Sequence, residues 1–139
     1  MSDENKAAIE KCVSVAQGDT GGSSAMRKIL LSMYNAAKWP LDVSEFRRLD
    51  AENARVAHML LTRFMSNKLG DEIHTFIQNG ESIFGGFWDT EEHDAMYRCT
   101  NDYSGEVRWN NYGREAMIYR FGVQSVEAFE AQLKEHAQA

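Results

Sequence analysis

The chain has 139 residues, the length of one ordinary domain, with 43% hydrophobic residues, 26% charged residues and a formal net charge of −6. This composition excludes an intrinsically disordered chain, and the apolar runs are far too short for a transmembrane helix, which needs about 20 residues. A single proline, Pro40, favours long helices over a sandwich fold.

The first helix is predicted over residues 3–16, where Ile9, Cys12, Val13 and Ala16 repeat at the spacing of one helical face. A second helix over residues 24–37 carries the clearest apolar stripe of the chain, and Ser23 or Ser24 is expected to cap its start.

Between these helices lies the segment QGDTGGSS, residues 17–24. It has two interpretations, a phosphate-binding loop or a corner between two helices. A phosphate loop follows a strand and precedes a lysine, whereas this segment follows a helical pattern and its next base is Arg27, inside the second helix. The sequence therefore favours a corner. If an anion binds here, we expect the amides of residues 23–25 to hold it.

Asp42 and Glu45 have the spacing of a helix N-terminal capping box, flanked by an apolar pair at Leu41 and Phe46. The apolar spacing that follows predicts one helix over residues 46–65. The alternative is that Asp50 caps a second helix and divides this segment in two.

The next elements are shorter. A turn at residues 66–70 precedes a short helix that ends at Asn79 and Gly80, and GESIFGGF, residues 80–87, is predicted to be a flexible corner. Asp89 and Glu92 again have capping-box spacing and predict a helix that ends near Arg98.

Residues 99–112 have two interpretations, an irregular loop or a small β-hairpin near residues 96–109 with MYRC and EVRW as its strands. A helix follows over residues 113–121, and Ser125 is expected to cap the last helix. We therefore expect a mainly α fold with six to seven helices, in one compact domain (residues 1–139) or in two lobes that meet near residue 70.

Charge divides the chain unevenly. Residues 1–70 carry ten Lys/Arg and eight Asp/Glu, whereas residues 71–139 carry five Lys/Arg and thirteen Asp/Glu. Phosphate contacts require cations, so the acidic half is a poor nucleic-acid binder. The acidic half suits a basic protein surface, because long-range attraction would accelerate the encounter of the two proteins.

No catalytic or metal-binding motif is present. The four histidines form no HExxH or i, i+4 pair, and no nucleophile motif such as G-x-S-x-G occurs; the histidines are His58, His74, His93 and His136. We expect no catalytic residue, no metal and no cofactor. The N-terminus is polar and lacks a secretory signal, and Cys12 and Cys99 match no disulfide or metal framework, which predicts a cytoplasmic protein with reduced thiols.

Nine of the fifteen aromatic residues lie between Phe84 and Phe121, interleaved with arginines and asparagines. We assign four of them to the core: Phe87, Trp88, Tyr119 and Phe121. Tyr, Trp and Arg dominate protein–protein hot spots, so the remainder has two interpretations, a loop packed on its own domain or a docking surface. The predicted docking surface consists of Glu91, Glu92, Asp94, Asp102, Tyr103, Glu106, Arg108, Trp109 and Tyr112.

The segment from Gly18 to Phe64, about a third of the chain, resembles a small family of unknown function that is associated with plasmids, integrative elements and phages of proteobacteria. The resemblance rests on a GDTG-x-S motif, an Asn-Ala pair and two Leu-Asp pairs, which are Gly18–Gly21 with Ser23, Asn35–Ala36, Leu41–Asp42 and Leu49–Asp50. It implies an accessory protein of a mobile element in the bacterial cytoplasm. Small acidic proteins in that setting, anti-CRISPR proteins among them, often bind and block a host complex.

We therefore expect a non-enzymatic acidic binding protein that inhibits a host nucleic-acid-handling complex with a basic surface, such as a subunit of a CRISPR effector. Two alternatives remain. One is a small hydrolase that uses His58, His74 or His93 with carboxylates. The other is a helical regulator that binds nucleic acid through the slightly basic first half, around Arg47, Arg48 and Arg55.

Overall fold

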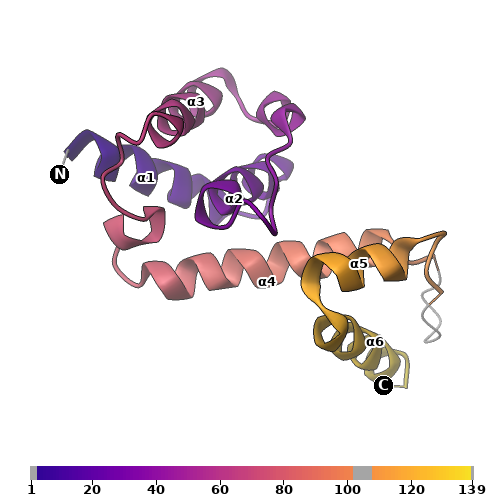
Figure 1. Cartoon of the computed structure of the whole chain (residues 1–139). Helices are drawn as coiled ribbons and strands as arrows, with labels where there is room; N and C mark the ends of the chain where they lie inside the picture. Colours follow the sequence, from indigo (N-terminus) through magenta and orange to yellow (C-terminus); the bar gives the residue numbers. More distant parts are fainter. Residues whose placement is uncertain (1–2, 102–107, 139) are drawn as a thin grey trace. The chain divides into compact units, whose positions relative to one another are not determined.

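The computed structural model describes residues 3–101 and 108–138, and its elements are helical (Figure 1). The prediction of a mainly α fold is confirmed. In chain order the elements are α1 (Asp3–Ala16), α2 (Gly21–Tyr34), η1 (Val43–Arg48), α3 (Ala51–Met65), η2 (Ile73–Phe76), α4 (Gly80–Arg98), α5 (Gly113–Phe121) and α6 (Val123–Gln138). None of the helices in the described part of the chain is both long and apolar enough to cross a lipid bilayer.

The chain forms two compact units, residues 1–89 and residues 90–139. The boundary falls inside α4, whereas the two-lobe alternative of the sequence analysis placed it near residue 70. Helix α4 therefore contributes its first half to the first unit and its second half to the second.

The first unit is built around the apolar stripes of its helices. Helices α1, α2 and α3 pack against one another, and η1 and η2 pack against α2 (Figure 1). Residues from five elements are almost completely buried in this core, and the largest are Ile9, Met26, Ile29, Leu30, Leu31, Leu60, Ile73 and Phe84. Each such side chain stabilises the fold by roughly 1.5–3 kcal/mol relative to leaving it in water.

The segment predicted as one helix over residues 46–65 is divided in two, so the single-helix prediction is wrong and the alternative is correct. Asp50 caps α3, because its carboxylate accepts a hydrogen bond of 2.8 Å from the amide of Asn53. Asp42 likewise caps η1, through the amide of Ser44 at 2.9 Å. Each carboxylate satisfies an amide that has no partner within its helix, and this local bond outweighs the continuous apolar spacing.

The segment GESIFGGF is not a corner but the first two turns of α4, and Asp89 lies inside that helix instead of capping it. Gly85 and Gly86 each lower helix propensity by about 1 kcal/mol relative to alanine. Phe84 and Phe87, which flank this pair, are buried with their ring centroids 5.6 Å apart. Burial of these two rings offsets the glycine penalty.

The second unit has a small core of Met96, Met117, Val126 and Phe129. The first three residues of MYRC end α4 and Cys99 follows that helix, so the hairpin interpretation is wrong in its first strand. In the part of the chain that the structure describes, one antiparallel bridge joins Thr100 to Trp109. Helix α6 begins at Val123, directly after Gly122 at φ 96°, so Ser125 lies within the helix and does not cap it.

The thiol of Cys12 should be unreactive in the folded protein. Both cysteines are free, and burial of Cys12 on the inner face of α1 raises the pKa of its thiol to about 12. The reactive thiolate is therefore scarce at pH 8. We expect iodoacetamide to label Cys12 only after denaturation, whereas the partly exposed Cys99 reacts first, as mass spectrometry of the peptides would show. Rapid labelling of native Cys12 would contradict its burial.

Candidate functional site

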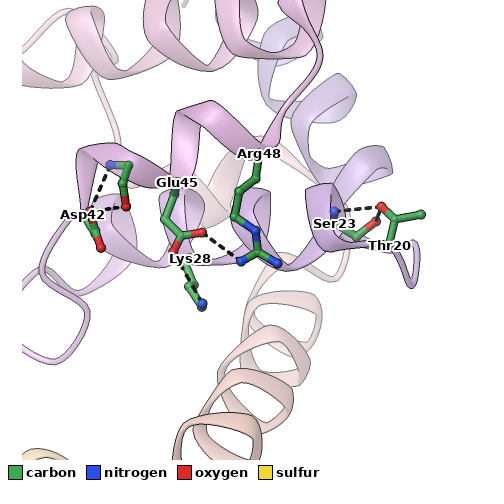
Figure 2. A network of polar contacts seen from close by, with 7 residues as sticks. Thr20, Ser23, Lys28, Asp42, Glu45 and Arg48 are labelled. Carbon is green, nitrogen blue, oxygen red and sulfur yellow. Dashed lines mark hydrogen bonds and ion pairs between the residues drawn. The ribbon is translucent and has the colours of Figure 1, made fainter. Parts of the chain in front are cut away.

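The GDTG-x-S motif forms the corner between α1 and α2, which confirms the preferred interpretation. Thr20, rather than Ser23 or Ser24, caps α2: its hydroxyl accepts a hydrogen bond of 3.0 Å from the amide of Ser23 (Figure 2). The amide of Ser24 donates to the carbonyl of Thr20 at 3.1 Å. Ser23, Ser24 and Ala25 are buried. The amides of Ser23 and Ser24 are thus already bonded, and the motif has a structural role.

A charged cluster lies beside this corner. The carboxylate of Glu45 is buried and lies 3.5 Å from the ammonium of Lys28 and 3.4 Å from the guanidinium of Arg48 (Figure 2). Two of the cations of the slightly basic first half are thus already paired with a carboxylate. Of the arginines named for a nucleic-acid interface, Arg47 and Arg55 are exposed and Arg48 is paired.

The residues of the predicted docking surface all belong to the second unit, and three of them lie on the part of α4 in that unit. Asp102, Tyr103 and Glu106 lie outside the described residues. Tyr112 is 83% exposed and Arg108 is exposed, whereas Glu92 and Asp94 are half-buried. Glu91 is only 1% exposed. We therefore remove it from the docking surface, because a residue packed inside the fold cannot contact a partner.

Trp109 is half-buried, and two contacts within the second unit hold its side chain. Its indole packs against Phe129, with ring centroids 5.8 Å apart, and its Nε1 donates a hydrogen bond of 3.0 Å to the carboxylate of Glu130. Glu130 also accepts two hydrogen bonds of 3.1 Å from the guanidinium of Arg114. These bonds tie the bridge segment and α5 to α6.

Trp109→Ala should therefore destabilise the protein by about 2 kcal/mol, because it removes a half-buried aromatic ring and a hydrogen bond to a charged group. Urea denaturation measures the change. The matched control is the exposed Tyr112, which lies at φ 65°, a conformation that asparagine tolerates better than tyrosine. Tyr112→Asn should leave stability unchanged or raise it by up to about 1 kcal/mol. Equal stability of Trp109→Ala and wild type would contradict the structural role.

Glu130 should make stability depend on pH. Hydrogen bonds from Arg114 first, and from Trp109, lower the pKa of its carboxyl below the ordinary value of 4.5. A carboxyl with a lowered pKa stabilises the fold above its unfolded pKa and loses this effect as pH falls through the folded pKa. We expect Glu130→Gln to cost about 1 kcal/mol at pH 7, since the groups are partly solvated. The difference should shrink below about pH 4.5; a constant difference at all pH values would contradict this account.

The core assignments in the aromatic-rich half have mixed outcomes. Phe87 is buried as predicted, Trp88 and Phe121 are half-buried, and Tyr119 is 91% exposed, so its assignment to the core is wrong. Tyr119 lies on α5, and Tyr112, the residue before this helix, is exposed as well.

A cavity of about 540 Å³ opens on the first unit, and its lining combines acids with aromatic rings. This volume is within the usual range for ligand pockets, roughly 300–1,000 Å³. None of the lining residues is Lys or Arg. They come from the end of α2, from η2 with the residue before it, and from α4, and they are Tyr34, Asn35, Glu72, His74, Glu81, Gly85, Trp88 and Asp89. We call this cavity the acidic pocket.

One face of α4 forms a wall of the acidic pocket. Glu81, Gly85, Trp88 and Asp89 follow the spacing i, i+4, i+7 and i+8, which places them along a single side of the helix. Gly85 has no neighbour within 4 Å of the position of a Cβ atom. The wall is therefore hollow at its centre, between one carboxylate a turn before and another a turn after.

Aromatic rings form the rest of the acidic pocket. The ring of Tyr34 meets His74 edge to face at 5.1 Å and Trp88 edge to face at 6.5 Å. Tyr34 is the last residue of α2, where the helix dipole places partial negative charge and where no basic side chain lies in the last turn. Both the side chains and the backbone of this pocket thus favour a cation.

The three histidines whose side chains the structure describes lie in different surroundings. His74 Nε2 lies 3.7 Å from Glu72, too far for a good hydrogen bond, and its buried Nδ1 has no hydrogen-bond partner in the described structure. His93 stacks on Tyr97 with ring centroids 6.0 Å apart, and His58 is exposed on α3. Within residues 3–101 and 108–138, no group of three His, Cys, Asp or Glu could hold a metal ion.

The fold and the site define a class: a helical protein whose first unit carries an acidic pocket lined by aromatic rings. The chain belongs to a family of unknown function, DUF7673, whose model matches residues 6–92. This region nearly coincides with the first unit and contains the GDTG-x-S motif and every residue that lines the acidic pocket. No curated protein and no solved structure matches the chain.

The family match confirms the coarser part of the expected resemblance, a small family of unknown function. The association with mobile elements stays a prediction. The acidic pocket was not predicted, because residues 80–87 were interpreted as a corner and not as helix. The spacing of Glu81, Gly85, Trp88 and Asp89 would have indicated the acidic face if that segment had been interpreted as helix.

Proposed function

We propose that the protein is a non-enzymatic acidic binding protein that engages a basic surface of another protein. The observation that carries this proposal is the acidic pocket, in which three carboxylates and three aromatic rings line one cavity without a lysine or an arginine. The net charge of −6 adds a long-range attraction toward a basic partner. The pocket lies within the region that defines the family.

A capture experiment with matched variants tests the proposal. Gly85→Leu fills the acidic pocket without changing its charge, whereas Gly86→Leu places the same side chain at an exposed neighbouring position where a Cβ also meets nothing within 4 Å. Both are helical positions that gain propensity from the change. Each full-length chain is immobilised and exposed to a nuclease-treated bacterial lysate, and retained proteins are identified by mass spectrometry.

We expect wild type and Gly86→Leu to retain the same basic protein and Gly85→Leu to lose it. The absence of any retained basic protein would contradict the proposed function. A basic protein that is retained from an untreated lysate and lost after nuclease treatment would favour the nucleic-acid regulator instead.

For the partner, we propose a host nucleic-acid-handling complex, with a CRISPR effector as the particular candidate and inhibition as the outcome. The support is the resemblance of the GDTG-x-S segment to proteins of mobile elements, together with the acidic charge. Expression of the chain in a bacterial strain with an active CRISPR system should raise the survival of a targeted plasmid. Unchanged interference would contradict this finer proposal and leave the capture experiment to test binding.

Hydrolysis is the second candidate function, because one histidine and three carboxylates line the same cavity. Three observations disfavour it. His74 is not oriented by a hydrogen bond at Nδ1, its Nε2 is 3.7 Å from Glu72, and no Ser, Thr or Cys lines the pocket to serve as a nucleophile. A panel of ester, phosphoester and glycoside substrates distinguishes the two functions, since a hydrolase would lose measurable turnover in His74→Gln.

A further inference from the structure

We infer that the acidic pocket binds the guanidinium of an arginine side chain supplied by the partner protein. This inference rests on the proposed function and names the group that the pocket recognises. Three features of the pocket carry it: the missing side chain at position 85, the carboxylates on either side of it, and the rings that flank it.

The first feature is the hollow over Gly85. Residues four positions apart on a helix are surface neighbours, with Cβ atoms about 5–6 Å apart. Glu81 and Asp89 are the i−4 and i+4 neighbours of Gly85, and both are exposed members of the pocket lining. A cation seated where a side chain of residue 85 would lie therefore has a carboxylate on each side, in the arrangement that pairs acids with bases along a helix.

The second feature is the ring of Trp88, the i+3 neighbour of the same position, with Tyr34 edge to face against it at 6.5 Å. A planar guanidinium stacks on an aromatic face while its edge donates to carboxylates. One arginine can thus satisfy the ring and both acids together.

The third feature is the number of carboxylates, which selects among cations. A guanidinium has five N–H donors in a fixed fork and bonds carboxylates on two sides at once. A quaternary ammonium has none and would leave the acids without donors, and the compact ammonium of lysine is more strongly hydrated and does not stack. The end of α2 adds its partial negative charge without a competing base in its last turn.

The test uses the intact chain and a small probe, N-acetyl-arginine-N-methylamide, followed by the indole N–H signal of Trp88 in nitrogen-15 spectra. The signal is assigned with Trp88→Phe, and the indole of Trp109 in the second unit is the internal reference. N-acetyl-lysine-N-methylamide and its trimethylated form are the competing probes.

We expect the Trp88 signal to shift saturably with the arginine probe, at a dissociation constant about threefold or more below that of the lysine probe. Gly85→Leu should abolish the shift and Gly86→Leu should retain it. Glu81→Gln and Asp89→Asn should each weaken binding about threefold, and the double variant about tenfold, as for exposed ion pairs.

Tighter binding of the lysine or trimethyl-lysine probe would overturn the assignment of a guanidinium. An unchanged shift in Gly85→Leu would overturn its location. This experiment and the capture experiment can fail separately. Arginine binding without a captured basic protein would contradict the proposed function alone. Capture of the same protein by wild type and by Gly85→Leu would contradict the arginine site alone.

Discussion

Gly80→Ala should lower the free energy of unfolding by about 3 kcal/mol, the cost of overpacking a site that cannot yield. A Cβ atom at Gly80 would overlap the carbonyl oxygen of His74 and lie 2.7 Å from its carbonyl carbon. Both atoms belong to the backbone of η2, so no side-chain rotation relieves the overlap. The close approach of the first turn of α4 to η2 therefore requires glycine.

Gly86→Ala is the matched control for this substitution. Gly86 is exposed inside the same helix, and a Cβ there meets nothing within 4 Å. Alanine should stabilise the protein at this position by up to about 1 kcal/mol, through helix propensity. Urea denaturation of both variants measures the contrast. A Gly80→Ala variant as stable as Gly86→Ala would show that η2 does not confine the start of α4.

Arg27→Met should also lower the free energy of unfolding by about 3 kcal/mol. The side chain of Arg27 is 8% exposed, and its Nη1 donates hydrogen bonds to the carbonyls of Ala16 at 2.8 Å and Gly18 at 2.9 Å. Carbonyls at the end of a helix have no partner within the helix, and a cation there also favours the dipole of α1. Methionine keeps the length of the apolar stem but removes the donors, so the buried carbonyl of Ala16 stays unsatisfied.

Two further variants isolate this effect. Arg27→Lys keeps the charge but not the fork of donors, and should recover about half of the lost stability. Arg47→Met makes the same change at an exposed position of η1 and should stay within about 0.5 kcal/mol of wild type. Thermal denaturation of the three variants provides the comparison. Equal effects at both positions would mean that the carbonyl bonds contribute nothing specific.

The sequence predicted the elements whose determinants lie within a few residues of one another. The stripes of α1 and α2, the corner at the GDTG-x-S motif and the cap at Asp42 are local features, because each depends on helical periodicity or on one side chain that bonds a nearby amide. The cap at Asp50 is local too, although one continuous helix was the preferred prediction from the sequence. The cap at Asp50 determined where α3 begins, and it outweighed the unbroken apolar spacing around it. Local bonds of this kind form within one turn and need no distant partner.

The sequence was misleading where packing outweighed a local signal. Gly85 and Gly86 usually indicate a turn, yet buried Phe84 and Phe87 on either side of them keep α4 continuous. Composition also placed Tyr119 in the core, although it is exposed, because the numbers of aromatic residues do not specify which face of α5 they occupy.

The sequence by itself determined that the chain is helical, that its first half contains a motif-bearing corner, and that its second half carries the negative net charge. Only the tertiary structure decided that Trp109 is tied to Glu130 and that the end of α2 meets the acidic face of α4 around a cavity. Those arrangements join residues tens of positions apart. Their geometry depends on how whole helices pack, which no short stretch of sequence specifies.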